Sequence, residues 1–268
     1  MRYLGIALIL CSTLAVALTA HATMTPDFLE ARTQDIRYGK SLDLTQNEFT
    51  SETRLGLTFQ SGNVRALAIS SNNHTTYRRQ RYEHNWRFGA FYDRVFAATS
   101  GVTTGTTAQY IFGTYRFDYY FAPRTTIYLG GGGFTDQVKG IDIAGQGFTG
   151  LSHYFLYTNR YHVGGAVGYE YLFEDRIGVS NDAIHSATSS LFGRYAVNPN
   201  VECTSLVEVK QNVEHLRDFR MESTTDLTSK ILAHLAIVTS VNLRFDNQPV
   251  EGFHKLDTRT SVTASIMF

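Results

Sequence analysis

The chain has 268 residues, with 24 basic and 24 acidic side chains and a formal net charge of zero. This balance gives no electrostatic reason to bind nucleic acid or another polyanion, so no nucleic-acid partner is expected. Aromatic residues make up 13% of the chain, including 18 Phe and 16 Tyr, although the mean hydropathy is only −0.17. This combination is typical of a transmembrane β-barrel, in which apolar residues alternate with polar ones and aromatic residues mark the membrane interfaces.

The first 22 residues have the pattern of a secretory signal peptide. Arg2 begins a charged region, residues 4–18 are apolar, and an A-x-A motif predicts cleavage between Ala22 and Thr23. The apolar region is too short to span a bilayer as a helix, and no later stretch is long enough to do so. Only one of the two cysteines, Cys203, lies beyond this segment, so no intramolecular disulfide is expected.

Residues 23–49 do not alternate, and we expect them to form a periplasmic leader. Thr25 and Pro26 have the residue types of a helix N-terminus, with Thr25 as the cap and Pro26 at the first helical position. Both a mobile tail and a short helix at the mouth of the barrel agree with this pattern.

Residues 50–268 alternate with a period of two between turn signals, which predicts an all-β, up-and-down transmembrane barrel. In residues 161–173, apolar and aromatic side chains occupy one face, and small and polar ones such as His162 and Glu170 occupy the other. We count twelve strands, with ten or fourteen as alternatives. They are predicted at 51–60, 64–73, 81–92, 106–121, 125–135, 144–155, 161–173, 184–197, 201–212, 222–231, 235–246 and 257–268.

The connections are predicted to alternate in length. If both termini face the periplasm, the even-numbered connections are periplasmic turns and the odd-numbered ones are external loops. The even connections at 122–124, 156–160, 198–200 and 232–234 are short, and the odd ones at 93–105, 136–143, 174–183, 213–221 and 247–256 are longer. Two exceptions are expected: the first connection, 61–63, is short, and the second, around 78–80, is long.

Two prolines predict hairpin registers. Centring a hairpin on Pro123 or Pro199 defines which residues of the flanking strands lie opposite each other. The predicted pairs are Tyr119–Ile127, Phe117–Leu129, Tyr115–Gly131, Tyr195–Cys203 and Leu191–Val207. The Tyr115 ring is expected to cover the glycine, a contact that stabilises curved sheets.

The last strand ends on an aromatic residue, Phe268, as outer-membrane barrels usually do. We therefore expect the protein in the outer membrane of a Gram-negative cell, in contact with its lipids. Phe268 is predicted to act there as an assembly signal for the barrel-assembly machinery. The sequence does not indicate an oligomeric state.

The predicted lumen carries charges of both signs. They are Arg54, Arg81, Glu83, Arg87, Glu170, Arg194, Glu202, Glu208, Lys210, Asp226, Lys230, Arg244, Asp257 and Arg259. A barrel of twelve strands is intermediate in size, so a narrow pore and a lumen plugged by salt bridges both agree with the pattern.

No motif indicates an enzyme, a cofactor or a metal. The glycine run at 130–133 lacks a following Lys-Ser/Thr and lies within an alternating strand, so strand curvature explains it better than phosphate binding. No histidine has the His-x-Ser spacing of outer-membrane phospholipases, and none lies in a cluster with metal-ligand spacing. One candidate pair, His153 and His162, is expected to meet inside the lumen near the periplasmic rim, as polar lining, a proton-sensitive gate or a metal site.

Two segments resemble a known family. Leu55-Gly56 with Ser61-Gly62-Asn63, and Asn242 to Asp246 followed by Asn247, Pro249, Gly252, Lys255 and Asp257-Thr258, resemble the YdiY-like, salt-induced outer-membrane proteins. Val250 replaces the second proline of that pattern. The resemblance covers residues 50–268 and implies an outer-membrane barrel without defined biochemical function or catalytic residues.

We therefore predict a non-enzymatic outer-membrane barrel that is structural or a narrow passive-diffusion channel. The alternative is a surface adhesion protein that uses the loops at 93–105, 174–183 and 247–256. An outer-membrane lipid hydrolase is the least favoured reading.

Overall fold

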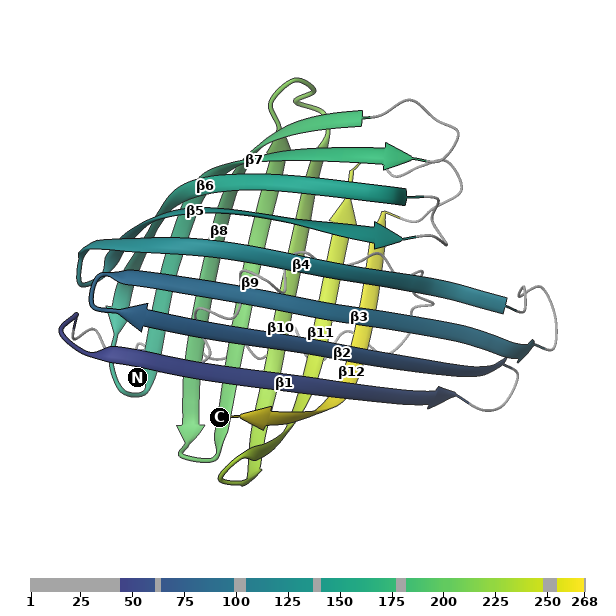
Figure 1. Ribbon diagram of the computed structural model, residues 1–268, viewed down its shortest axis with the longest axis horizontal. Helices are drawn as coiled ribbons and strands as arrows, with labels where there is room; N and C mark the ends of the chain where they lie inside the picture. Colours follow the sequence, from purple (N-terminus) through teal and green to yellow (C-terminus); the bar gives the residue numbers. More distant parts are fainter. Residues whose placement is uncertain are drawn as a thin grey trace.

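The computed structural model describes residues 44–60, 64–98, 105–136, 141–176, 182–247 and 255–267. Twelve antiparallel strands form one closed barrel, in which β1 pairs with both β2 and β12 and every other strand pairs with its sequence neighbours (Figure 1). The predicted fold and strand count are confirmed. The strands are β1 (Asn47–Gln60), β2 (Val64–Arg79), β3 (Tyr82–Ala98), β4 (Gly105–Ala122), β5 (Thr125–Asp136), β6 (Ile141–Tyr157), β7 (Tyr161–Arg176), β8 (Asp182–Asn198), β9 (Val201–Asn212), β10 (Phe219–Leu232), β11 (Leu235–Asp246) and β12 (Leu256–Met267).

The two rims of the barrel differ in the length of their connections. The short-turn rim contains the turns 80–81, 123–124, 158–160, 199–200 and 233–234, and β12 ends beside them (Figure 1). The long-loop rim contains the connections 61–63, 99–104, 137–140, 177–181, 213–218 and 247–255. The predicted alternation is confirmed, and the side of the membrane that each rim faces stays a prediction.

The second connection differs from the prediction. Strand β2 continues to Arg79, so only Gln80 and Arg81 separate it from β3. The apolar pattern disappears after Ile69, but the alternation persists because His74 and Thr76 are buried while Tyr77 is exposed. The expectation of a long connection here is wrong, since polar residues occupy both faces of the end of the strand.

The tight turn places a side chain in the left-handed region of backbone conformation. Gln80 has a φ of 54°, which a residue with a Cβ adopts at a cost of about 1–2 kcal/mol. Glycine removes this cost but loses about 0.5–1 kcal/mol of chain entropy on folding. We therefore expect Gln80→Gly to raise the free energy of unfolding by about 0.5–1 kcal/mol. Urea unfolding in lipid vesicles measures this change, and a lower stability than the unsubstituted protein would contradict it.

The predicted registers are confirmed in both hairpins. Tyr119, Phe117 and Tyr115 lie opposite Ile127, Leu129 and Gly131, and Tyr195 and Leu191 lie opposite Cys203 and Val207. The expected contact of the Tyr115 ring with Gly131 is wrong. The Tyr115 hydroxyl lies 2.8 Å from the His84 Nδ1 instead, and its ring packs against Trp86 with a centroid distance of 5.9 Å.

Aromatic rings do cover other glycines, and the tightest of these contacts lie on the inner face of the barrel. A Cβ built on Gly89, Gly130 or Gly164 would lie 2.4 Å from a ring carbon of an aromatic residue on the adjacent strand. These aromatic residues are Phe112, Phe148 and Phe192 respectively. The absence of a side chain at each glycine lets a large ring occupy the inner wall of a curved sheet.

Polar and apolar faces alternate as predicted. Phe88 is 58% exposed on the outside of β3, whereas its neighbour Arg87 is only 2% exposed inside. Strand β7 shows the same contrast between Val167 and Glu170. An apolar exterior around a charged interior is the arrangement of a transmembrane barrel and the reverse of a soluble one. No helix in the described part of the chain is long and apolar enough to span a membrane.

Candidate functional site

The barrel lumen is the candidate functional site because buried charges line it. Most of the predicted lumen charges are confirmed as buried or partly buried: Arg54, Glu83, Arg87, Glu170, Arg194, Glu202, Glu208, Lys210 and Asp226. Arg81 and Lys230 are exposed instead, because they flank short turns where the alternation of faces ends. The side chains of Arg244, Asp257 and Arg259 lie outside the described part of the structure.

Among the described residues, further charged side chains that the sequence analysis did not single out line the lumen. Glu52, Arg78 and Asp118 are each at most 3% exposed, and Arg116 is partly buried beside Asp118. The sequence contained a usable signal for these residues. Glu52 is two positions from Arg54 and therefore lies on the same face of the strand, and Arg116 and Asp118 share a face for the same reason.

One ion-pair cluster connects strands that are not neighbours. The Arg54 guanidinium on β1 lies 2.9 Å from the Glu52 carboxylate and 3.2 Å from the Asp226 carboxylate on β10. The Ser265 hydroxyl on β12 also hydrogen-bonds to Glu52. Because β11 and β12 separate β10 from β1 in the barrel wall, the Arg54–Asp226 pair bridges part of the lumen.

A second cluster joins β3, β4 and β5. The Asn85 amide donates to Glu83 at 3.0 Å and to Asp118 at 3.3 Å, and the Tyr120 hydroxyl donates to the other Glu83 oxygen at 3.0 Å. Arg116 pairs with Asp118 at 2.5 Å. Its guanidinium also lies 4.2 Å from the centre of the Tyr128 ring, a cation–π distance. The cluster satisfies both carboxylates with several donors, as buried charges require.

Further pairs lie on β7, β8 and β9. The Lys210 ammonium lies 2.9 Å from Glu170, which is two strands away, and 3.7 Å from Glu208. Arg194 donates two hydrogen bonds, of 3.0 and 2.7 Å, to one oxygen of Glu202. The lumen wall thus carries both signs of charge around the barrel, mostly paired with each other.

A cavity lies between the side chains where β4–β9 face the lumen. This cavity has a volume of about 20 Å³, which is close to the space that one water molecule needs. Its lining combines ionic, polar and aromatic groups: Arg116, Asp118, Tyr120, Thr126, Tyr128, Ser152, Tyr154, Ala166, Ser190, Phe192 and Leu206. A large solute therefore does not fit between these residues in the arrangement shown.

The structure does not bring His153 and His162 together. A register shift between Tyr154 and Leu156 places His162 opposite Tyr157, with 4.0 Å between the ring centroids. His153 lies opposite Gly165 and is exposed, with its Nδ1 2.9 Å from the Thr125 hydroxyl. The predicted lumen pair is wrong because β6 continues to Tyr157, which moves the turn to 158–160 and places His153 and His162 at different levels of the β6–β7 hairpin. The described residues contain no group of three or more potential metal ligands.

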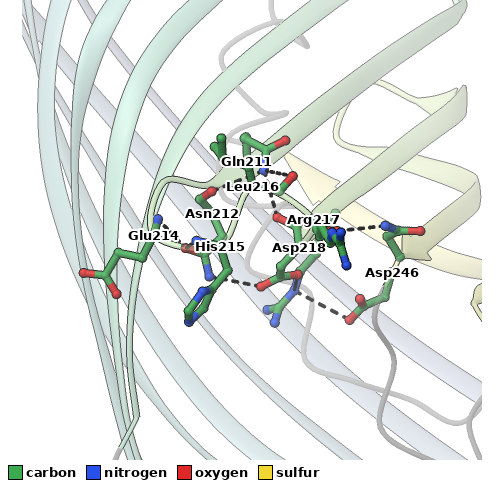
Figure 2. A network of polar contacts seen from close by, with 10 residues as sticks. Gln211, Asn212, Glu214, His215, Leu216, Arg217, Asp218 and Asp246 are labelled. Atoms are coloured by element: carbon green, nitrogen blue, oxygen red, sulfur yellow. Dashed lines mark hydrogen bonds and ion pairs between the residues drawn. The ribbon is translucent and has the colours of Figure 1, made fainter.

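The connection between β9 and β10 is organised by its own hydrogen bonds (Figure 2). The Asn212 side chain accepts from the backbone amides of Glu214 and His215 at 2.9 and 3.1 Å, and donates to Asp218 at 3.1 Å. The Gln211 amide donates to three backbone carbonyl oxygens of the same segment, at 3.0–3.2 Å. These bonds hold the loop in one conformation above the long-loop rim.

The loops predicted for adhesion lie partly outside the residues that the structure describes. Residues 99–104, 177–181 and 248–254 of those loops lie outside the described residues. The predicted assembly signal, Phe268, and the predicted cleavage site between Ala22 and Thr23 also lie outside them. These expectations stay predictions.

Comparison with protein families identifies the barrel region. The model of the family described as "Protein of unknown function, DUF481" matches residues 53–268. The chain belongs to this family. The match of the family model covers almost the same residues as the resemblance to the YdiY-like proteins. The narrower YdiY-like assignment stays a prediction. No curated protein matches the sequence.

The solved structures similar to this chain include a porin and an outer-membrane channel. The NanC porin has a TM-score of 0.52 at 10% identity, covering 81% of this chain and 99% of that chain. An outer-membrane channel (COG4313) from Pseudomonas putida F1 has a TM-score of 0.50 at 13% identity, covering 83% and 95%. At such identities the likeness shows the fold alone. The outer-membrane location of this protein stays a prediction.

Proposed function

We propose that this protein is a non-enzymatic outer-membrane barrel that acts as a narrow passive-diffusion channel for water and small ions. The observation that carries this proposal is the set of ion pairs across the lumen, above all Arg54–Asp226 between β1 and β10. Replacing buried ion pairs with apolar residues is often neutral or stabilising. Stability alone therefore does not explain a charged lumen, whereas a path for water and ions requires polar lining.

The balance of charge indicates what such a channel would select. The lumen pairs arginine and lysine with aspartate and glutamate in every cluster, so neither sign dominates the wall. We infer weak selectivity between small cations and anions. The small free volume among the β4–β9 side chains supports a low conductance and the exclusion of large solutes.

Planar-bilayer recording of the refolded full chain tests this proposal. We expect a small single-channel conductance, and a larger one in the double variant Arg54→Ala/Asp226→Ala, because the two bridging side chains are removed. The matched control is Ser205→Ala/Thr225→Ala, which removes a hydrogen-bonded pair at 3.0 Å on the opposite face of β9 and β10. No conductance from correctly folded protein would contradict the channel, and an unchanged conductance in the first variant would contradict this constriction.

A further inference from the structure

The exposed charges at the short-turn rim have one sign. We consider the five short turns with the two residues on either side of each, all of which the structure describes. The exposed charged residues there are four arginines, Arg79, Arg81, Arg124 and Arg160. They belong to three successive turns, β2–β3, β4–β5 and β6–β7, which are neighbours around the barrel. The other charged residues of these segments are buried, namely Arg78, Glu83 and Glu202.

No described carboxylate neutralises the four arginines, which we call the arginine arc. Arg81 donates only to the backbone carbonyls of Tyr120 and Phe121, at 3.4 and 3.2 Å. Arg160 donates to the Tyr195 hydroxyl at 3.0 Å. Within the described ranges the arc therefore presents a net positive charge to its surroundings, in a protein whose overall charge is zero.

Aromatic rings place the arc at the edge of the apolar exterior. The Arg160 guanidinium lies 5.3 Å from the centre of the Tyr195 ring, which stacks on Tyr161 at 5.0 Å. Tyr82 and Phe121 flank the other turns and are each 49% exposed. Tyrosine and phenylalanine beside short turns mark the membrane–water interface of a barrel. The guanidinium groups thus lie at the depth of lipid headgroups.

We propose that the arginine arc binds the phosphates of anionic phospholipids in the leaflet that contacts this rim. Guanidinium groups form paired hydrogen bonds with phosphate oxygens. The adjacent rings provide an apolar surface for the glycerol and acyl chains, which a free phosphate ion would not use. The proposal rests on the membrane location of the barrel but not on its conducting solutes.

Native mass spectrometry of the full chain tests lipid binding directly. The refolded protein is extracted from vesicles of equal parts phosphatidylglycerol and phosphatidylcholine, and the retained lipids are counted. The unsubstituted protein should retain phosphatidylglycerol preferentially, and Arg124→Gln/Arg160→Gln should lose roughly fivefold in lipid affinity for each arginine. The matched control, Arg94→Gln/Arg217→Gln, removes two exposed arginines near the long-loop rim and should keep the preference.

The remaining outcomes decide against the proposal. Equal retention of both lipids by the unsubstituted protein, or equal loss in both double variants, would overturn it. Displacement of phosphatidylglycerol by millimolar inorganic phosphate would indicate an ion site and also overturn it. Arg160→Lys keeps the charge but cannot form the paired hydrogen bonds of a guanidinium, so it should lose part of the preference and serves as a second variant if the double variant folds poorly. Bilayer conductance should be the same in all these variants. A failure of the channel proposal can therefore be distinguished from a failure of the lipid-binding proposal.

Discussion

Replacing Arg54 with alanine is expected to lower the free energy of unfolding by about 3–5 kcal/mol. The Arg54 guanidinium is bonded to Glu52 and Asp226, whose side chains are 3% and 1% exposed. Its removal leaves two buried carboxylates without this cation, and restoring their hydration requires the lumen to open locally. Urea unfolding in vesicles, followed by tryptophan fluorescence, measures the change.

A double-mutant cycle separates this interaction from other effects of the substitution. Asp226→Ala removes one of the two carboxylates that Arg54 contacts, so the second substitution should cost less in the Arg54→Ala background than alone. The expected coupling is about 0.5–3 kcal/mol, as for residues that share an ion pair. Additive costs would show that Arg54 and Asp226 do not interact, and would also weaken the constriction proposed for the channel.

Replacing Gly130 with alanine is expected to destabilise the barrel by about 1–3 kcal/mol through overpacking. A Cβ there would lie 2.4 Å from the Phe148 ring and 2.6 Å from the Tyr115 carbonyl oxygen. The ring can rotate away at some cost, but the carbonyl belongs to the neighbouring strand and moves only with the backbone. The unfolding midpoint in urea measures the effect.

Gly147 provides a matched control on the adjacent strand. A Cβ at this position would meet no atom within 4 Å, so alanine fits without strain. The lost flexibility of the unfolded chain should even raise stability, by about 0.5–1 kcal/mol. If Gly130→Ala and Gly147→Ala changed stability alike, the glycines under the inner rings would not be selected by packing.

The features that depend on local pattern could be predicted closely. Alternation with a period of two placed all twelve strands, because the two faces of a strand in this barrel meet different environments. Pro123 and Pro199 predicted two hairpin registers correctly, since a proline confined to a two-residue turn centres the pairing on that turn. The sequence likewise predicts an all-β barrel of the outer-membrane type.

Features that depend on single residues within a strand could not be predicted. The extension of β2 to Arg79 lacks an apolar signal, and the register shift between Tyr154 and Leu156 has none. The extension of β6 to Tyr157, which moves the turn to 158–160, separates His153 from His162. A bulge arises from the fit between two strands, so the sequence of one strand does not reveal it.

The sequence by itself determined the barrel class, the strand count, the alternation of its faces and most of the charges in its lumen. Only the tertiary structure decided which charges meet. Arg54 and Asp226 lie 172 positions apart, and closure of the barrel brings them together by pairing β1 with β12. Pairing of neighbouring strands along the chain, in contrast, places three successive turns side by side as the arginine arc. The Arg54–Asp226 pair depends on strand stagger and closure, which are properties of the whole sheet rather than of any segment.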